Sequence, residues 1–114
     1  MKIIDRINDS AFQKMTLLTE ETGEKIFCTL SYLPTQFQWV LDIQYQDFTL
    51  NGISVLNSPN ILRGYKNILS FGIGISTNDG FDPYYIEDFS SGRAQFYLLN
   101  TADVEEAESR LNEV

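Results

Sequence analysis

Residues 37–45 show the clearest alternation of apolar and polar side chains in the chain. The two sets are Phe37, Trp39, Leu41, Ile43 and Tyr45 on one side, and Gln38, Val40, Asp42 and Gln44 on the other. A period of two is typical of a β-strand that buries one face. The stretch also carries the only tryptophan, and large aromatic side chains dominate core energetics. We therefore expect this strand to lie at the centre of the fold, with Trp39 inside.

Apolar segments on both sides can pair with this strand. Residues 26–32 precede it, joined by a short link that contains Pro34, and residues 48–55 follow the polar break at residues 46–47. This order predicts a three-stranded antiparallel meander. The apolar positions change parity at Gly52, which predicts a β-bulge or a sharp bend there.

Further strands are predicted at residues 12–19, 68–76 and 94–100. The segment 68–76 has one apolar face and one face of small residues, namely Ser70, Gly72, Gly74 and Ser76. Small side chains allow another backbone or a large ring to approach closely. Together the elements predict a mainly β fold, a small antiparallel barrel or sandwich of about six to seven strands.

The two ends differ from this β-rich domain of residues 12–100. Residues 1–11 mix apolar and charged side chains without a period, which is typical of an N-terminal arm that becomes ordered against a partner. Residues 101–114 are rich in helix-forming residues and predict a C-terminal α-helix. Asp103 and Glu106 have the spacing of a capping box.

Length, charge and hydropathy disfavour several classes of protein. The chain has 114 residues, enough for one domain, and a net charge of −8. That charge disfavours binding to nucleic acid or to an anionic membrane surface, both of which require clustered basic residues. The N-terminus is too short and too charged for a secretory signal, and no apolar run approaches the roughly 20 residues of a membrane span. We therefore expect a soluble protein from a reducing compartment, with neither nucleic acid nor membrane as a partner.

The residue inventory argues against catalysis. The chain has no histidine, which excludes Ser-His-Asp and Cys-His sites and histidine-containing zinc sites. The single cysteine, Cys28, lies on the apolar side of its strand and is expected to be buried and unreactive. Four acidic residues cluster around one turn but lack calcium-loop spacing, so a solvated turn is favoured: Asp79, Asp82, Glu87 and Asp88. The sequence predicts no catalytic residue, no cofactor and no metal site.

Two places are candidates for contact with another protein. Tyr84 and Tyr85 are adjacent in a loop, and tyrosine is enriched at interfaces, although core packing of at least one is the alternative. On the predicted helix, Val104 and Leu111 belong to a narrow apolar stripe with Ala107 and Val114. That stripe could serve assembly, or it could pack on the sheet of its own chain.

The order of several motifs resembles a known family. The motifs are residues 39–43, Gly52 with Ile53, residues 60–65, Asp82 with Pro83, and Asp88 with Phe89, followed by an apolar last strand. This order resembles the small baseplate plug proteins of contractile-tailed bacteriophages, including the cyanophage type, over about residues 12–100.

The resemblance implies a structural, non-enzymatic virion protein in the tail baseplate, assembled in the host cytoplasm. It implies hub, tube or spike proteins as partners, and a symmetric oligomer, threefold or sixfold. The alternative is a small non-enzymatic β-barrel that binds a peptide or a carbohydrate.

Overall fold

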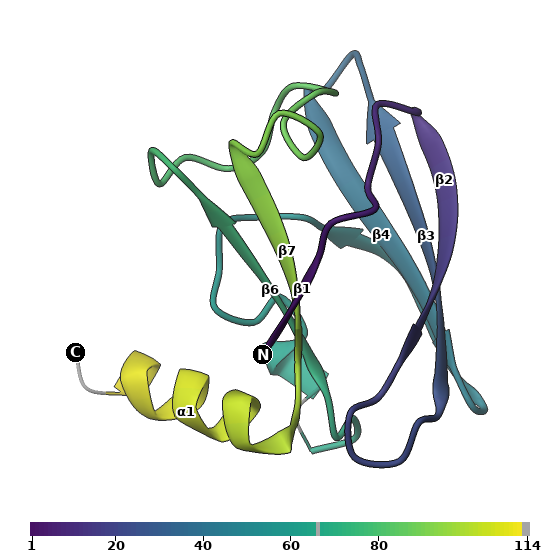
Figure 1. The fold of residues 1–114 in the computed structure, drawn as a ribbon, viewed down its shortest axis with the longest axis vertical. Coiled ribbons are helices and arrows are strands. Elements are labelled where there is room, and N and C mark those ends of the chain that lie inside the picture. The colour runs from purple at the N-terminus through teal and green to yellow at the C-terminus, as the bar shows by residue number, and fades with distance from the viewer. Residues whose placement is uncertain (66, 113–114) are drawn as a thin grey trace.

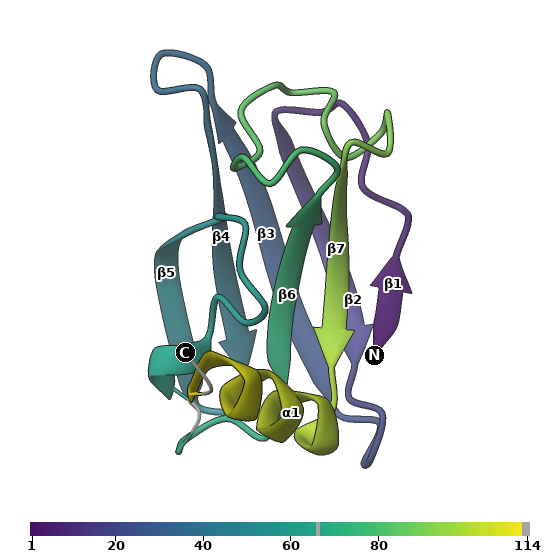
Figure 2. The ribbon, with the colours of Figure 1, turned by 90° about the vertical axis from the view of Figure 1, so that its left-hand side faces the viewer.

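The computed structural model describes residues 1–65 and 67–112, and the side chains of residues 1–65 and 67–110. The elements in these ranges are β1 (Lys2–Ile4), β2 (Phe12–Leu18), β3 (Lys25–Leu33), β4 (Gln38–Tyr45), β5 (Phe48–Ser54), the 3-10 helix η1 (Arg63–Tyr65), β6 (Gly72–Thr77), β7 (Ala94–Leu99) and α1 (Thr101–Asn112). They form two antiparallel sheets, in the orders β1-β7-β6 and β2-β3-β4-β5, which face each other (Figures 1 and 2). The predicted mainly β fold with a C-terminal helix is confirmed, and it is a sandwich because the two sheets do not close into a barrel.

The core lies between the two sheets and is centred on β4. Trp39 and Leu41 are 0% exposed, as the alternation predicts. Tyr32 and Phe89 pack against Trp39 in edge-on geometry, with ring centroids 5.3 and 5.5 Å away. The prediction that Phe37 belongs to the apolar side of this strand is wrong. The strand begins only at residue 38, and the Phe37 side chain is 62% exposed.

The predicted irregularity at Gly52 is confirmed. The register between β4 and β5 shifts between Leu41 and Ile43. Gly52 has a φ of 71°, which L-residues seldom adopt, and its N–H donates to Asp42 Oδ1 at 2.7 Å. The bulge turns the end of β5 so that Val55, which follows the strand, is fully buried.

The small-residue face of β6 is also confirmed as a place of close approach. A Cβ atom added to Gly74 would lie 2.9 Å from the carbonyl oxygen of Pro59. The preceding loop runs along β6, where Ser58 and Ile75 exchange two backbone hydrogen bonds of 2.9 Å. The strand begins at Gly72, four residues later than expected, and the loop covers an edge that would otherwise expose unpaired backbone groups.

The prediction of an N-terminal arm is wrong for its first part. β1 pairs with β7, with Ile3 opposite Tyr97, so it belongs to the three-stranded sheet. Ile4 and Ile7 are 7% and 5% exposed and pack in the core. The segment that follows carries the chain from one sheet to the other (Figure 1).

The helix α1 begins at Thr101, as predicted, but its capping box lies three residues earlier than predicted. Asp103 N–H donates to Asn100 Oδ1 at 2.8 Å, and Asn100 N–H donates to Asp103 Oδ2 at 3.1 Å. Asn100 is therefore the cap, and the predicted pairing of Asp103 with Glu106 is wrong. The helix lies across one end of the sandwich and its C-terminal part projects beyond the three-stranded sheet (Figure 1).

We expect the Cys28 thiol to be inert in the native protein. Its side chain is 2% exposed, and burial raises the pKa of the thiol to about 12, so almost no thiolate exists at pH 8. A disulfide reagent such as DTNB should leave Cys28 unmodified at pH 8 and label it fully after unfolding in guanidinium chloride. Rapid labelling of the folded protein would contradict this expectation.

Candidate interaction surface at the loop end

Exposed apolar side chains from three connections surround one hollow at the end of the sandwich away from α1. Phe37, Leu56 and Phe81 are 62%, 43% and 69% exposed, and all three line a hollow of 550 Å³ together with Tyr84. Tyr85 lies beside Tyr84 and is 50% exposed. We name these five residues the loop-end surface. Single exposed apolar residues are common on proteins, but a contiguous group around a hollow marks an interaction site.

Phe37 adopts a backbone conformation that is unusual for a large side chain. It is the last residue of the turn that connects β3 to β4 and has a φ of 50°. The left-handed region costs an L-residue about 1–2 kcal/mol. The ring is exposed, so burial within its own chain offsets little of that cost. Such strain is concentrated at functional positions, which favours a role for Phe37 in contact with a partner.

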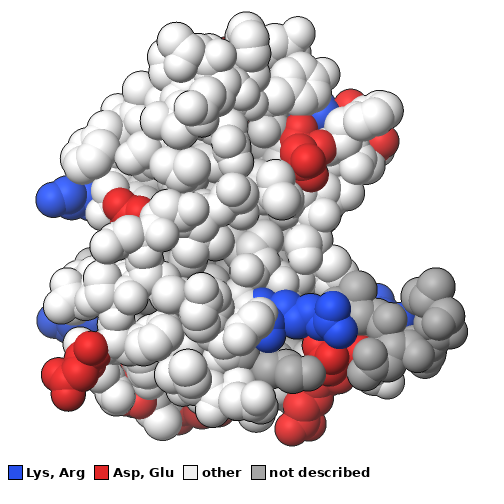
Figure 3. Space-filling view, turned by 180° about the vertical axis from the view of Figure 1, so that it is seen from behind, with Lys and Arg blue, Asp and Glu red and all other residues white. Residues whose placement is uncertain are grey.

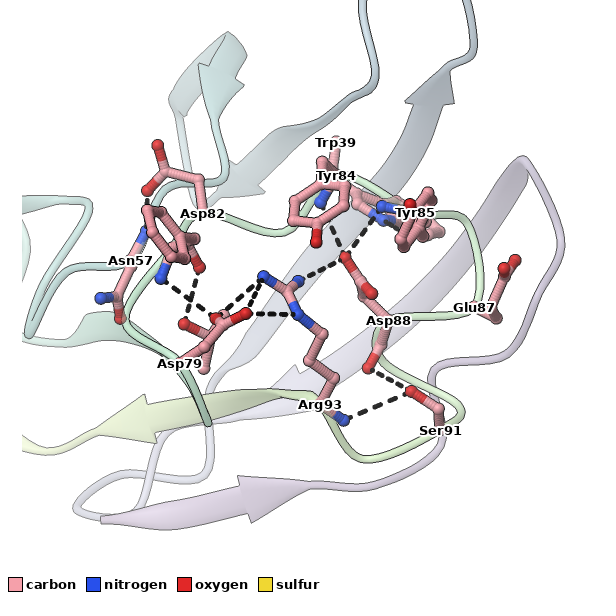
Figure 4. A network of polar contacts seen from close by, with 12 residues as sticks. Trp39, Asn57, Asp79, Asp82, Tyr84, Tyr85, Glu87, Asp88, Ser91 and Arg93 are labelled. Carbon is pink, nitrogen blue, oxygen red and sulfur yellow. Dashed lines mark hydrogen bonds and ion pairs between the residues drawn. The ribbon is translucent and has the colours of Figure 1, made fainter.

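A buried carboxylate holds the loop that carries Tyr84 and Tyr85 (Figure 4). The Asp88 side chain is 2% exposed, and its Oδ2 accepts the N–H groups of Tyr84 and Tyr85 at 2.7 and 2.8 Å. Arg93 Nη1 donates to the same oxygen at 2.7 Å. The expectation of a solvated acidic turn is therefore wrong for Asp88, while the Asp79 side chain is 44% exposed.

The two tyrosines are also tied to the core strands. The hydroxyl of Tyr32 donates to the carbonyl of Tyr84 at 2.5 Å, and Trp39 Nε1 donates to the carbonyl of Tyr85 at 3.1 Å. The guanidinium of Arg93 lies 4.3 Å from the centroid of the Tyr84 ring. Tyr84 is half-buried by these contacts and Tyr85 remains exposed, so the loop-end surface rests on a rigid base.

The structure does not bring the four sequence-predicted contact residues together. Val104 lies on α1, at the other end of the sandwich from the connection between β6 and β7 that carries the tyrosines (Figure 1), and it is 9% exposed. It is therefore covered by its own chain. The backbone of Leu111 belongs to α1, but its side chain lies outside the described residues, as does Val114. The sequence did not identify Phe37, Leu56 and Phe81 as contact residues. They lie in three different connections, and only the fold brings them around one hollow.

We expect acid to weaken the base of this surface through Asp79. Burial raises the pKa of the Asp79 carboxyl, but hydrogen bonds from Arg93 and from the Phe81 N–H lower it by more. The pKa of this carboxyl therefore lies below its ordinary value of 3.8. A depressed pKa in the folded state means stabilisation that is present above the ordinary pKa and is lost as the pH falls through the folded value. The melting temperatures of wild type and Asp79→Asn should therefore differ at pH 7 and converge as the pH falls toward 2. A difference that stays constant with pH would contradict this.

Within the described residues, no group of three or more histidine, cysteine, aspartate or glutamate side chains is placed to hold a metal ion. No helix in that part of the chain is both long enough and apolar enough to cross a membrane. A scan against models of known protein families finds no match, and no curated protein matches the sequence.

Proposed function

We propose that this protein is a non-enzymatic structural subunit of a contractile phage tail, a baseplate plug or hub-associated protein. In this role it binds a neighbouring tail protein through the loop-end surface. The observation that carries the proposal is the group of exposed aromatic rings around one hollow, held on a rigid base. Aromatic residues at the centre of an interface supply most of its binding energy.

Rigidity favours docking because little conformational entropy is lost on binding. Asp88 fixes the backbone of both tyrosines, and Trp39 connects that backbone to the core. Both residues belong to the motifs that carry the resemblance to baseplate plug proteins. The resemblance thus rests in part on residues that build the base of the loop-end surface.

Charge indicates the kind of partner face. The chain carries a net charge of −8, and the exposed acidic residues Asp79, Asp82 and Glu87 lie in the loop beside the surface. Figure 3 shows the acidic and basic side chains on one face of the molecule. Electrostatic complementarity favours a partner whose face combines apolar pockets with basic residues around them. Hub, tube and spike proteins of the same tail are the candidates.

Co-expression with each of these tail proteins, followed by size-exclusion chromatography with light scattering, tests the proposal. We expect a stable complex with one of them and loss of that complex in the double variant Phe37→Ser/Phe81→Ser. The matched control is Ile68→Ser, because Ile68 is 63% exposed and lies outside the surface. No complex with any tail protein, or a complex that the double variant still forms, would rule the proposal out.

A further inference from the structure

The outward face of the four-stranded sheet carries a second hollow, unrelated to the loop-end surface. Its volume is 560 Å³, within the range of small-molecule sites. Phe27 lies in it and is 50% exposed, although the residues on both sides of it in β3, Ile26 and Cys28, are buried. A large aromatic side chain thus projects into solvent from the middle of a sheet.

Polar side chains surround Phe27 in two rows across the strands. The strand register gives one row as Thr16, Phe27, Gln44 and Thr49. The neighbouring row contains Lys14, Thr29 and Asp42, with Asn51 beside it in the same hollow. With strands about 4.8 Å apart and alternate residues about 7 Å apart, the rows cover about 14 by 7 Å. That area is long enough for a short oligosaccharide.

The hydrogen-bonding groups of this face are free for a ligand. Within the described part of the chain, no hydrogen bond involves the side chains of Thr16, Thr29, Gln44, Thr49 or Asn51. Asp42 uses Oδ1 to accept the Gly52 N–H, which fixes its carboxylate and leaves Oδ2 open. The hollow therefore offers amides, hydroxyls and one carboxylate around the ring of Phe27.

This combination matches the chemistry of a neutral sugar. The ring of a β-linked glucose unit has axial C–H groups on its faces, which pack on an aromatic side chain, and hydroxyls around its edge, which need donors and acceptors. Lys14 and Asp42 are the charged residues that line the hollow and they balance, so the hollow has no net preference for an anion or a cation. Of the residues that line it, Phe27 alone is a large apolar side chain exposed to solvent, whereas the centre of a protein interface is rich in such side chains.

We infer that the outward face of β2–β5 binds a neutral β-linked oligosaccharide, with one sugar ring stacked on Phe27 and its hydroxyls bound by Gln44, Asn51 and Asp42. The site is independent of the proposed docking function, because it lies on a different face of the molecule.

Titration of the ¹⁵N-labelled protein with cellohexaose and with chitohexaose tests the inference. We expect chemical-shift changes confined to the amides of β2–β5 with at least one of the two sugars. Phe27→Ala should weaken that binding by about tenfold or more, a change well resolved in a titration. The matched control is Ile3→Ala, because Ile3 is 54% exposed, belongs to β1 of the other sheet and does not line the hollow.

Three outcomes would overturn the inference: no shift changes with either sugar at millimolar concentration, changes outside β2–β5, or equal binding by the Phe27→Ala variant. Phe27→Ala should keep the melting temperature of wild type, since the side chain is half exposed, and should still form the complex with the tail protein. Failure of sugar binding and failure of docking are therefore separate results.

Discussion

Replacing Trp39 with alanine is expected to destabilise the fold by about 3–5 kcal/mol, the usual cost of truncating a large buried aromatic side chain. Trp39 is 0% exposed, contacts Tyr32 and Phe89 edge-on, and donates its indole N–H to the carbonyl of Tyr85. The truncation removes core volume from the central strand and leaves that carbonyl without its donor. Urea unfolding followed by circular dichroism measures the loss.

Two control variants separate the contribution of ring burial from that of the indole hydrogen bond. Phe37→Ala removes an aromatic ring two residues earlier in the chain, but an exposed one, and should change stability by about 0.5 kcal/mol or less. Trp39→Phe keeps most of the ring and loses the N–H, so the loss should be smaller than for alanine and should include about 1 kcal/mol for the missing hydrogen bond. A soluble Trp39→Ala protein with the stability of wild type would show that Trp39 is not at the centre of the core.

The sandwich could be predicted from sequence because its main strands have a strong local pattern. Alternation placed Trp39, Leu41 and Ile43 inside, and a change of parity identified the bulge at Gly52. The pattern failed at Phe37, where the alternation continues but the backbone has already turned, with a φ of 50°. Hydrophobic periodicity carries no information about where a strand stops when the next residue is also apolar.

The N-terminal strand could not be predicted, because it depends on a distant partner. β1 has only three residues, and it is held by β7, more than 90 positions later in the chain. Ile4 and Ile7 are buried only because this pairing brings them against the core. The helix cap, in contrast, had a local signal that was overlooked: Asn100 followed three residues later by Asp103.

The candidate site also combines residues that have a local signal in the sequence with residues that only the fold brings together. Tyr84 and Tyr85 were identified by residue type, but Phe37, Leu56 and Phe81 come from three connections that only the fold brings together. Composition also suggested that every acidic residue of the loop would face water. Asp88 is buried because Arg93 and two backbone N–H groups supply the donors that water would otherwise provide, and this arrangement depends on the three-dimensional path of the loop.

Replacing Asp88 with alanine should cost about 3 kcal/mol of stability and should also disorder the loop-end surface. Its carboxylate accepts three hydrogen bonds while 2% exposed, so its removal leaves two backbone N–H groups without an acceptor and Arg93 with one carboxylate partner fewer. Breaking a buried ion pair costs about 3–5 kcal/mol, and we expect the lower end because Arg93 keeps Asp79. Urea unfolding measures the stability, and amide hydrogen exchange of Tyr84 and Tyr85 measures the disorder.

The matched control is Asp82→Ala in the same loop. Asp82 is exposed and accepts one backbone N–H, from Asn57 at 2.8 Å, so its loss should cost about 0.5–1 kcal/mol. If Asp88 supports the docking surface, Asp88→Ala should speed amide exchange at both tyrosines and weaken the complex with the tail protein, whereas Asp82→Ala should leave the exchange of those amides unchanged. Equal stability losses in the two variants would mean that the buried carboxylate contributes no more than an exposed one. Loss of stability with the tail complex intact would mean instead that Asp88 supports the fold alone and not the docking surface.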